Sequence, residues 1–221
     1  MISVAIDGPA GAGKSTLAKR LAKELQFVYV DTGAMYRAIG LYALRQGVSP
    51  KDAAGVTALL PQISLALQYA QGAQHIYLND EDVSAAIRAE EVSMAASAVS
   101  AHPAVRAFLL DTQRSLAANG NVLMDGRDIG TVILPNATVK IFLTASPEAR
   151  AERRTKELLE KGEKADYETV LADVRERDYN DTHRAAAPLK QAEDAVLVDT
   201  TALNFAQSYE ALLAIIRAKM A

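Results

Sequence analysis

Residues 8–15 of the chain read Gly8-Pro9-Ala10-Gly11-Ala12-Gly13-Lys14-Ser15. They match the pattern G-x-x-x-x-G-K-[ST], a loop whose backbone N–H groups surround phosphate oxygens. The apolar residues 2–6 precede the loop and predict a buried strand. Residues 14–25 follow it with leucines at positions 17, 21 and 25, which predicts an amphipathic helix. A strand, this loop and a helix in that order predict an α/β protein that binds a nucleoside triphosphate.

The residue types of the loop indicate its chemistry. Glycines allow consecutive N–H groups to point inward, and the start of the following helix adds the positive end of its dipole. The Lys14 ammonium can reach the β- and γ-phosphates, and the Ser15 hydroxyl can ligate Mg²⁺. A dinucleotide-binding loop, G-x-G-x-x-G, is excluded because Thr16 stands where its third glycine would be. The residues expected to bind ATP are Gly8, Pro9, Ala10, Gly11, Ala12, Gly13, Lys14, Ser15 and Thr16.

Composition places the chain among ordinary globular proteins. It has 221 residues, of which 24 are basic and 27 acidic, a net charge of −3, and no cysteine. We therefore expect one domain over residues 1–221, without a disulfide framework or a cysteine nucleophile. The near-neutral charge argues against a general binder of nucleic acid or membranes. The sequence shows no targeting signal and no apolar run near the ~20 residues of a membrane helix, so we expect a cytoplasmic protein.

The rest of the chain alternates short apolar runs with helical segments, which is the pattern of a parallel α/β sheet. Further strands of this sheet are predicted at residues 27–30, 122–124, 139–144 and 196–198, which with residues 2–6 makes five strands in the parallel sheet. Helices are predicted at about 34–46, 87–100 and 103–118. Residues 60–86 interrupt the alternation with two strands around Gln71-Gly72 and a turn at Asn79-Asp80. This segment predicts an antiparallel insert.

Charged residues follow two of these strands directly. Residues 31–37 read Asp-Thr-Gly-Ala-Met-Tyr-Arg, and residues 125–131 read Asp-Gly-Arg-Asp-Ile-Gly-Thr. Ligands of open α/β sheets bind at the carboxyl ends of strands, so these segments are candidate ligand sites. Farther along, Arg177, Asp181 and Arg184 share one helical face, where the same spacing would also suit a salt-bridge ladder. Asp125 ends a short apolar strand as an Mg²⁺-holding carboxylate does, although a helix cap or a buried loop acceptor would look alike.

Four segments together make the chain resemble the bacterial cytidylate kinases, a group within the nucleoside monophosphate kinases of the P-loop class. They are residues 8–15, 31–37, 125–131 and 176–189. The resemblance covers nearly the whole chain and implies phosphoryl transfer from ATP to CMP or dCMP, with Mg²⁺ and without a covalent intermediate. It also implies a three-layer P-loop kinase fold with a central parallel five-stranded sheet, an antiparallel NMP-binding insert over residues 60–102 and a short helical lid over residues 150–166. A monomer is expected.

The resemblance also implies roles for single residues. Thr32 stands where the family often has serine in its acceptor-binding segment. Ser97, Arg106 and Asp128 would recognise cytosine, because a carboxylate and an arginine match its amino donor and its acceptors. Arg177 and Asp181 would hold the sugar hydroxyls, while Arg37, Arg127 and Arg184 would clamp the acceptor phosphate. Ser15 and Asp125 would hold Mg²⁺. The expected catalytic residues are Lys14, Arg127, Arg153 and Arg154.

Two other functions remain compatible with the sequence. One is a P-loop kinase with a different small acceptor, and the other is a nucleotide-dependent switch without catalysis. The many arginines after the loop argue against the switch, because a switch needs no second anion pocket. The charged residues 150–164 could also form a solvated helix face instead of a lid. His75, His102 and His183 lack ligand spacing, and phosphoryl transfer to a phosphate needs no general base, so we assign them no catalytic role.

Overall fold

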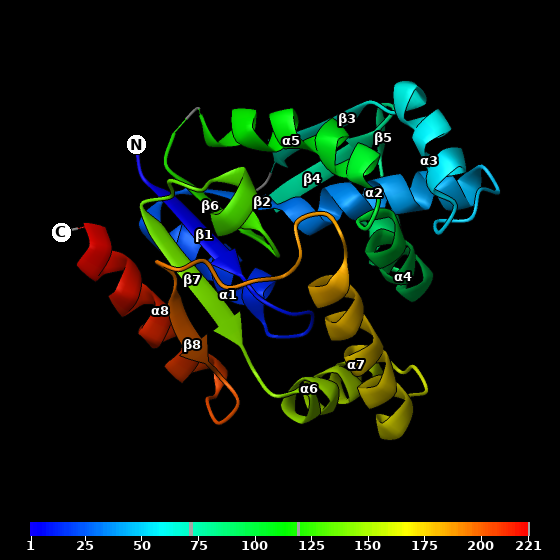
Figure 1. The fold of residues 1–221 in the computed structure, drawn as a ribbon. Helices are drawn as coiled ribbons and strands as arrows, with labels where there is room; N and C mark the ends of the chain where they lie inside the picture. Colours follow the sequence, from blue (N-terminus) through cyan, green and yellow to red (C-terminus); the bar gives the residue numbers. More distant parts are fainter. Residues whose placement is uncertain (71–72, 119, 221) are drawn as a thin grey trace. The chain divides into compact units, whose positions relative to one another are not determined.

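Figure 1 shows a computed structural model that describes residues 1–70, 73–118 and 120–220. The chain divides into two compact units, the first formed by Met1–Tyr29 with Gly120–Ala221 and the second by Val30–Asn119. The turn predicted at Gln71-Gly72 lies outside the described residues.

The first unit holds the parallel sheet except for the last two residues of strand β2, Val28–Asp31, which are assigned to the second unit. Within the described residues, five strands pair in the order β2-β6-β1-β7-β8. Their bounds are β1 Ser3–Asp7, β2 Val28–Asp31, β6 Val122–Gly126, β7 Val139–Thr144 and β8 Val196–Asp199. The pairs β1–β6, β1–β7 and β7–β8 are parallel. β1 and β6 are buried almost throughout, which explains why they read as continuous apolar runs.

Two helices of this unit share a core with the sheet. They are α1, Lys14–Leu25, and α8, Phe205–Met220 (Figure 1). Leu17 and Leu21 of α1 and Leu212 and Ile216 of α8 lie in one buried cluster with apolar side chains of β1, β6 and β7. Two further helices, α6 at Pro147–Glu160 and α7 at Tyr167–His183, form a smaller core of their own.

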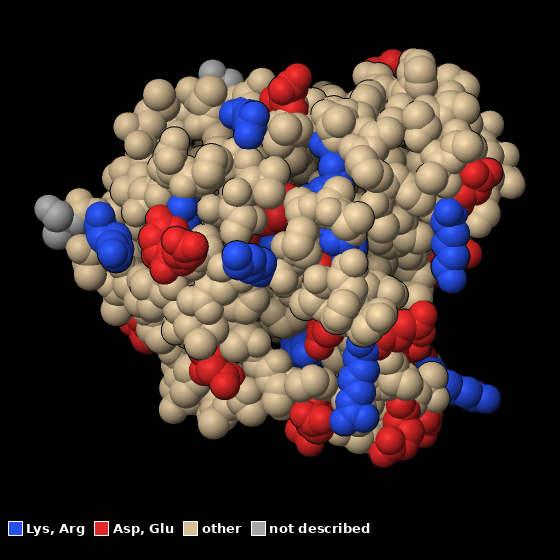
Figure 2. Space-filling model, viewed as in Figure 1, with Lys and Arg blue, Asp and Glu red and all other residues tan. Residues whose placement is uncertain are grey.

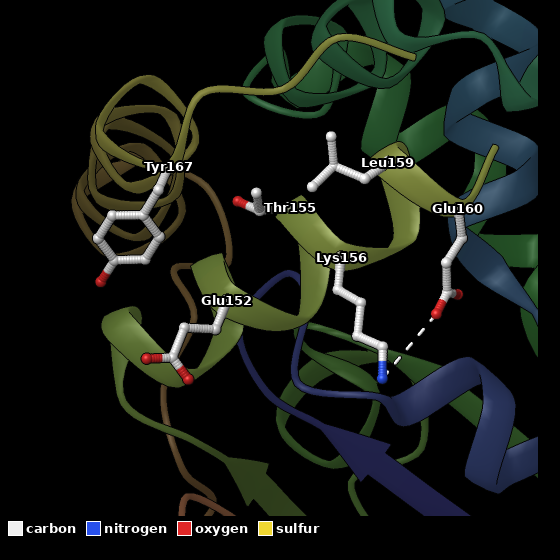
Figure 3. A pocket seen from close by; sticks show the side chains of 6 residues that line it. All are labelled: Glu152, Thr155, Lys156, Leu159, Glu160 and Tyr167. Carbon is white, nitrogen blue, oxygen red and sulfur yellow. Dashed lines mark ion pairs between the residues drawn. The ribbon is translucent and has the colours of Figure 1, made fainter. Parts of the chain in front are cut away.

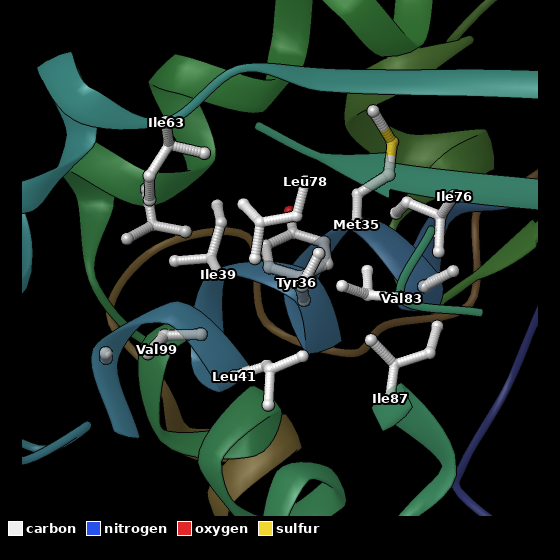
Figure 4. Packing of buried hydrophobic residues seen from close by; sticks show 14 of the residues in the cluster. Met35, Tyr36, Ile39, Leu41, Ile63, Ile76, Leu78, Val83, Ile87 and Val99 are labelled. Atoms are coloured by element: carbon white, nitrogen blue, oxygen red, sulfur yellow. The ribbon is translucent and has the colours of Figure 1, made fainter. Parts of the chain in front are cut away.

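The second unit packs helices against an antiparallel sheet of described strands in the order β3-β4-β5. The strands are β3 Leu65–Ala70, β4 Ala73–Leu78 and β5 Glu81–Asp82. The helices are α2 Thr32–Arg45, α3 Ala53–Leu59, α4 Glu90–Val99 and α5 Pro103–Ala117. Figure 4 shows Met35 and Ile39 of α2 facing Ile76 and Leu78 of β4 across this core. Gly40 lets α2 approach α4 closely, since a Cβ there would lie 3.0 Å from the Ala95 Cβ.

The parallel five-stranded sheet and the antiparallel segment predicted from the sequence are confirmed. The boundaries differ where local bonds decide them. α2 begins at Thr32 instead of about residue 34, because the Asp31 carboxylate accepts a hydrogen bond from the Ala34 N–H and caps the helix. The helix predicted over 87–100 is a 3₁₀ turn at Ala86–Arg88 followed by α4. Residues Ile129–Ile133, which follow β6, form a π-helical turn.

None of the helices within the described ranges combines the length and the apolar character needed to cross a lipid bilayer. On the face drawn in Figure 2, the described basic and acidic side chains are interspersed.

Candidate active site

The phosphate loop joins β1 to α1 in the first unit. Gly8 has φ of +150°, and a Cβ there would lie 1.9 Å from the Leu143 carbonyl oxygen, so no side chain fits. Gly13 has φ of +85° and occupies the N-cap of α1 in the left-handed region. The start of α1 carries no side-chain cap, which leaves its first N–H groups for an anion.

Lys14 is buried beneath this loop, with 5% of its surface exposed. Its ammonium donates a hydrogen bond of 2.7 Å to the Pro9 carbonyl oxygen. Burial, helped by repulsion from Arg127, lowers the pKa of Lys14 to about 7, although Asp125 acts in the opposite direction. An anion bound in the loop would favour the charged ammonium, so Lys14 is suited to pair with a polyphosphate.

Ser15 and Asp125 meet at one place in this unit. The Ser15 hydroxyl donates a 2.7 Å hydrogen bond to one Asp125 oxygen, and the Tyr29 hydroxyl donates an equally short one to the other. Hydroxyl and carboxylate oxygens are the ligands that Mg²⁺ prefers. Among the described residues, no group of three or more His, Asp or Glu could hold a metal by itself. The pair therefore fits an ion that also takes its ligands from nucleotide phosphates and water.

A cluster of opposite charges, buried except for a partly exposed Arg127, lies near Lys14. Arg127 Nε donates to Asp181 Oδ2 at 2.8 Å, and Arg184 lies 3.6 Å from both Asp181 Oδ1 and Asp128 Oδ1. Burial disfavours the charge of Arg127, but the nearby carboxylates, Asp181 foremost, together outweigh it and raise the pKa of that guanidinium. Burial likewise disfavours the Asp181 carboxylate, and Arg127 with Arg184 and Lys14 brings the pKa of Asp181 below its ordinary value. The cluster thus places two arginines beside two carboxylates close to Lys14.

A second buried carboxylate, Asp7, ends β1 immediately before the loop. It accepts hydrogen bonds from the N–H groups of Ile129 and Gly130, each 2.7 Å long. Burial raises the pKa of Asp7 to about 6, although the bonds from Gly130 and Ile129 oppose this rise.

Arg150 ties the phosphate loop to α7. Its guanidinium donates to the Ala10 carbonyl oxygen at 3.0 Å and to both carboxylate oxygens of Asp178. Only 2% of the Arg150 surface is exposed, so Arg150 is a buried structural residue that links the loop to α7.

The second unit contains the other residues that the sequence predicts to bind the acceptor. Thr32 is buried at the first turn of α2, and Arg37, one turn later, donates to the capping carboxylate of Asp31 at 2.7 Å. Ser97 and Arg106 lie on α4 and α5, both adjacent to Ser100, whose hydroxyl donates to the Ser97 carbonyl oxygen and whose carbonyl oxygen accepts from Arg106. The Arg106 guanidinium also lies over the Tyr36 ring, 5.5 Å from its centre.

The family model for cytidylate kinase matches residues 4–218. The chain belongs to the cytidylate kinase family. A cytidylate kinase from Carboxydothermus hydrogenoformans is 51% identical over 98% of this chain and 97% of its own. One from Geobacillus sp. strain WCH70 is 48% identical over 99% and 98%, respectively. The resemblance seen in the sequence is thereby confirmed, and as a family member the chain is a phosphotransferase.

Two solved structures share the fold of this family member. One is a gluconokinase from Sinorhizobium meliloti 1021, with a TM-score of 0.52 and 15% identity over 98% of this chain and 92% of its own. The other is an uncharacterized protein from Eubacterium ventriosum ATCC 27560, with a TM-score of 0.52 and 11% identity over 99% of both chains. At these identities the likeness concerns the fold alone.

The predicted lid arginines of this cytidylate kinase family member have other partners in the structure. Arg153 donates to the hydroxyl and the carbonyl oxygen of Thr200, and Arg154 pairs with Glu157 at 3.1 Å. The next turns of α6 line a shallow surface pocket of about 550 Å³ against Tyr167, the first residue of α7 (Figure 3). None of the residues that line it was predicted to bind nucleotide.

Three structural contributors to this site were not predicted from the sequence. They are Asp7, Tyr29 and the Arg150–Asp178 pair, all of which act on residues of the predicted site. Asp7 carried one usable signal, since it is an acidic residue at the end of a buried strand beside the loop. For Tyr29 and Asp178, the partner lies 96 and 28 residues away, and no spacing rule links such positions.

Proposed function

We propose that this protein transfers the γ-phosphoryl group of ATP to CMP or dCMP, which gives ADP and CDP or dCDP. The observation that carries the proposal is the largely buried cluster of Arg127, Asp128, Asp181 and Arg184 close to Lys14. Its two arginines can bind the phosphate of a second substrate. Its two carboxylates can accept hydrogen bonds from the sugar and the base of that substrate. The relatives' shared name, cytidylate kinase, supports CMP as the acceptor.

Each side of the transfer has its own residues in this proposal. The loop residues 8–16 bind the ATP phosphates, and the Lys14 ammonium neutralises charge that develops between the β- and γ-phosphates. Arg127, Arg184 and Arg37 hold the acceptor phosphate in line with the γ-phosphorus. An oxygen of that phosphate is already an anionic nucleophile, so no general base is needed.

The donor set around Ser15 fits Mg²⁺, and we propose that Ser15 and Asp125 hold it. Bound to the polyphosphate, Mg²⁺ supplies positive charge opposite the oxygens on which charge develops. Tyr29, which donates to Asp125, orients the carboxylate toward Ser15.

Discrimination of the base is proposed to rest on Asp128, Arg106 and Ser97, and binding of the sugar on Arg177 and Asp181. Thr32 is proposed to contact the acceptor, with residues 60–102 as the CMP-binding insert of a single kinase domain over residues 1–221. We also propose a monomeric cytoplasmic enzyme of pyrimidine nucleotide metabolism. A monomer would not need a second subunit to complete the site.

The acceptor is tested by measuring ADP formation from ATP and Mg²⁺ with CMP, dCMP, UMP, AMP, GMP and dTMP separately. CMP and dCMP are expected to give the highest kcat/KM. Reactions without acceptor and reactions with EDTA are the controls, and both should be near background. A higher kcat/KM for a purine acceptor, or activity that survives EDTA, would contradict the proposal.

We further propose that residues 150–166 close over the bound nucleotides, with Arg153 and Arg154 approaching the transferred phosphoryl group. Closure excludes water, which would otherwise hydrolyse ATP. Arg153 would first have to leave Thr200, so the contacts of the free protein are expected to break on closure. Hydrogen exchange should show more protection of residues 150–166 with a bisubstrate analogue than without it. Equal protection in both states would count against a lid.

A further inference from the structure

Asp7 connects the two halves of the proposed reaction within the first unit. It is the last residue of β1, and Gly8 of the phosphate loop follows it directly. Its carboxylate accepts hydrogen bonds from the backbone N–H groups of Ile129 and Gly130. These two residues come immediately after Arg127 and Asp128, which are proposed to bind the acceptor.

The position of this carboxylate is fixed by the sheet. β1 has β6 on one side and β7 on the other, and Asp7 is in register with Gly126 and Phe142. Only 5% of its surface is exposed. The segment of Arg127 and Asp128 is therefore held at both ends, by β6 pairing at Gly126 and by the Asp7 carboxylate at residues 129–130.

We propose that Asp7 is a positioning residue for acceptor recognition, because its two hydrogen bonds set the direction of Arg127 and Asp128 relative to the phosphate loop. This inference rests on the proposed function. Asp7 is assigned to neither nucleotide, and its two hydrogen bonds go to the 127–130 segment.

A carboxylate is the side chain that this role requires. Each of its two oxygens accepts one of two consecutive N–H groups, whereas an amide offers one oxygen and turns its NH₂ toward the other N–H. Burial raises the pKa of Asp7 to about 6, so the carboxyl is ionised above that pH. Its charged neighbours are Lys14, which stabilises the carboxylate, and Asp128, which destabilises it.

The test is Asp7→Asn, assayed at pH 8, where the wild-type carboxyl is ionised. Losing one hydrogen bond to a charged acceptor is expected to raise KM for CMP roughly tenfold. The ratio of kcat/KM for CMP over UMP should fall, because Asp128 no longer has a fixed direction. KM for ATP should stay within about twofold of the wild-type value, since Arg127 and Asp128 are assigned to the acceptor.

Leu212→Ala is the control for lost stability, since Leu212 is fully buried in α8 and belongs to neither nucleotide site. It should lower Tm and leave the CMP-to-UMP ratio unchanged. If Asp7→Asn lowers Tm in the same way without a change in KM for CMP, Asp7 is a structural residue only and the inference is overturned. An equal rise of KM for ATP would also overturn it. The proposed function is judged separately, by the wild-type enzyme's choice of acceptor.

If Asp7→Asn does not fold, hydrogen exchange of the wild-type protein tests the inference instead. The amide hydrogens of Ile129 and Gly130 should exchange slowly without nucleotide, as amides bonded to a buried acceptor do. Exchange as fast as that of an exposed loop would overturn the inference.

Discussion

Replacing Lys14 by alanine is expected to lower kcat with ATP and CMP by roughly 10²- to 10³-fold. The ammonium is the group placed to meet charge on the β- and γ-phosphate oxygens, and a buried site makes that interaction strong. The fold should survive, because burial already disfavours the charge of Lys14 and its ammonium donates a hydrogen bond to the Pro9 carbonyl oxygen. Turnover at saturating ATP and CMP, with a melting curve for each protein, measures both parts of the prediction.

Lys23→Ala is the matched control for Lys14→Ala. Lys23 is an exposed residue near the end of the same helix, so its removal should change neither turnover nor Tm appreciably. Near-normal turnover in Lys14→Ala would remove the assignment of residues 8–16 to ATP. A collapse of Tm in that variant would instead mark Lys14 as a structural residue.

The sequence was most informative where function and local geometry coincide. The phosphate loop needs glycine at positions 8 and 13 for steric reasons that any protein with this loop shares, so a pattern of residues could identify it. β1, β6 and β7 were also predictable, because strands buried on both faces are continuously apolar. The order of the strands in the sheet was not predicted, since it depends on contacts between distant segments.

The pairing of side chains within the charged cluster could be predicted only in part from the sequence. The spacing of Arg177, Asp181 and Arg184 suggested a ladder along one helix. In the structure, Asp181 does pair with Arg184 at the expected spacing, 3.6 Å away, but its shorter contact is with Arg127, 54 residues away. The π-helical turn at Ile129–Ile133 also depends on a partner distant in the sequence, because the Ile129 N–H donates a hydrogen bond to Asp7, 122 residues away. Such bonds override local propensity and leave no periodic signal.

Asp128→Asn is expected to lower kcat/KM for CMP roughly ten- to hundredfold and to narrow the preference for CMP over UMP. The carboxylate is proposed to accept a hydrogen bond from the cytosine amino group. An asparagine keeps the size but loses the charge, and its NH₂ can donate to the uracil carbonyl. The measurement is kcat/KM for CMP and for UMP in both proteins, alongside Tm.

The structure makes the ratio of the two substrates the decisive quantity in that experiment. Asp128 lies 3.6 Å from Arg184 and is almost fully buried, so losing its charge should lower Tm whether or not it reads the base. Glu24→Gln, the same chemical change at an exposed pair with Arg217, should affect neither Tm nor the ratio strongly. If Asp128 only neutralises Arg184, CMP and UMP lose activity equally and the ratio stays at the wild-type value. A fall in the ratio that exceeds any common loss would support contact between Asp128 and the base, because the two acceptors differ only in the base.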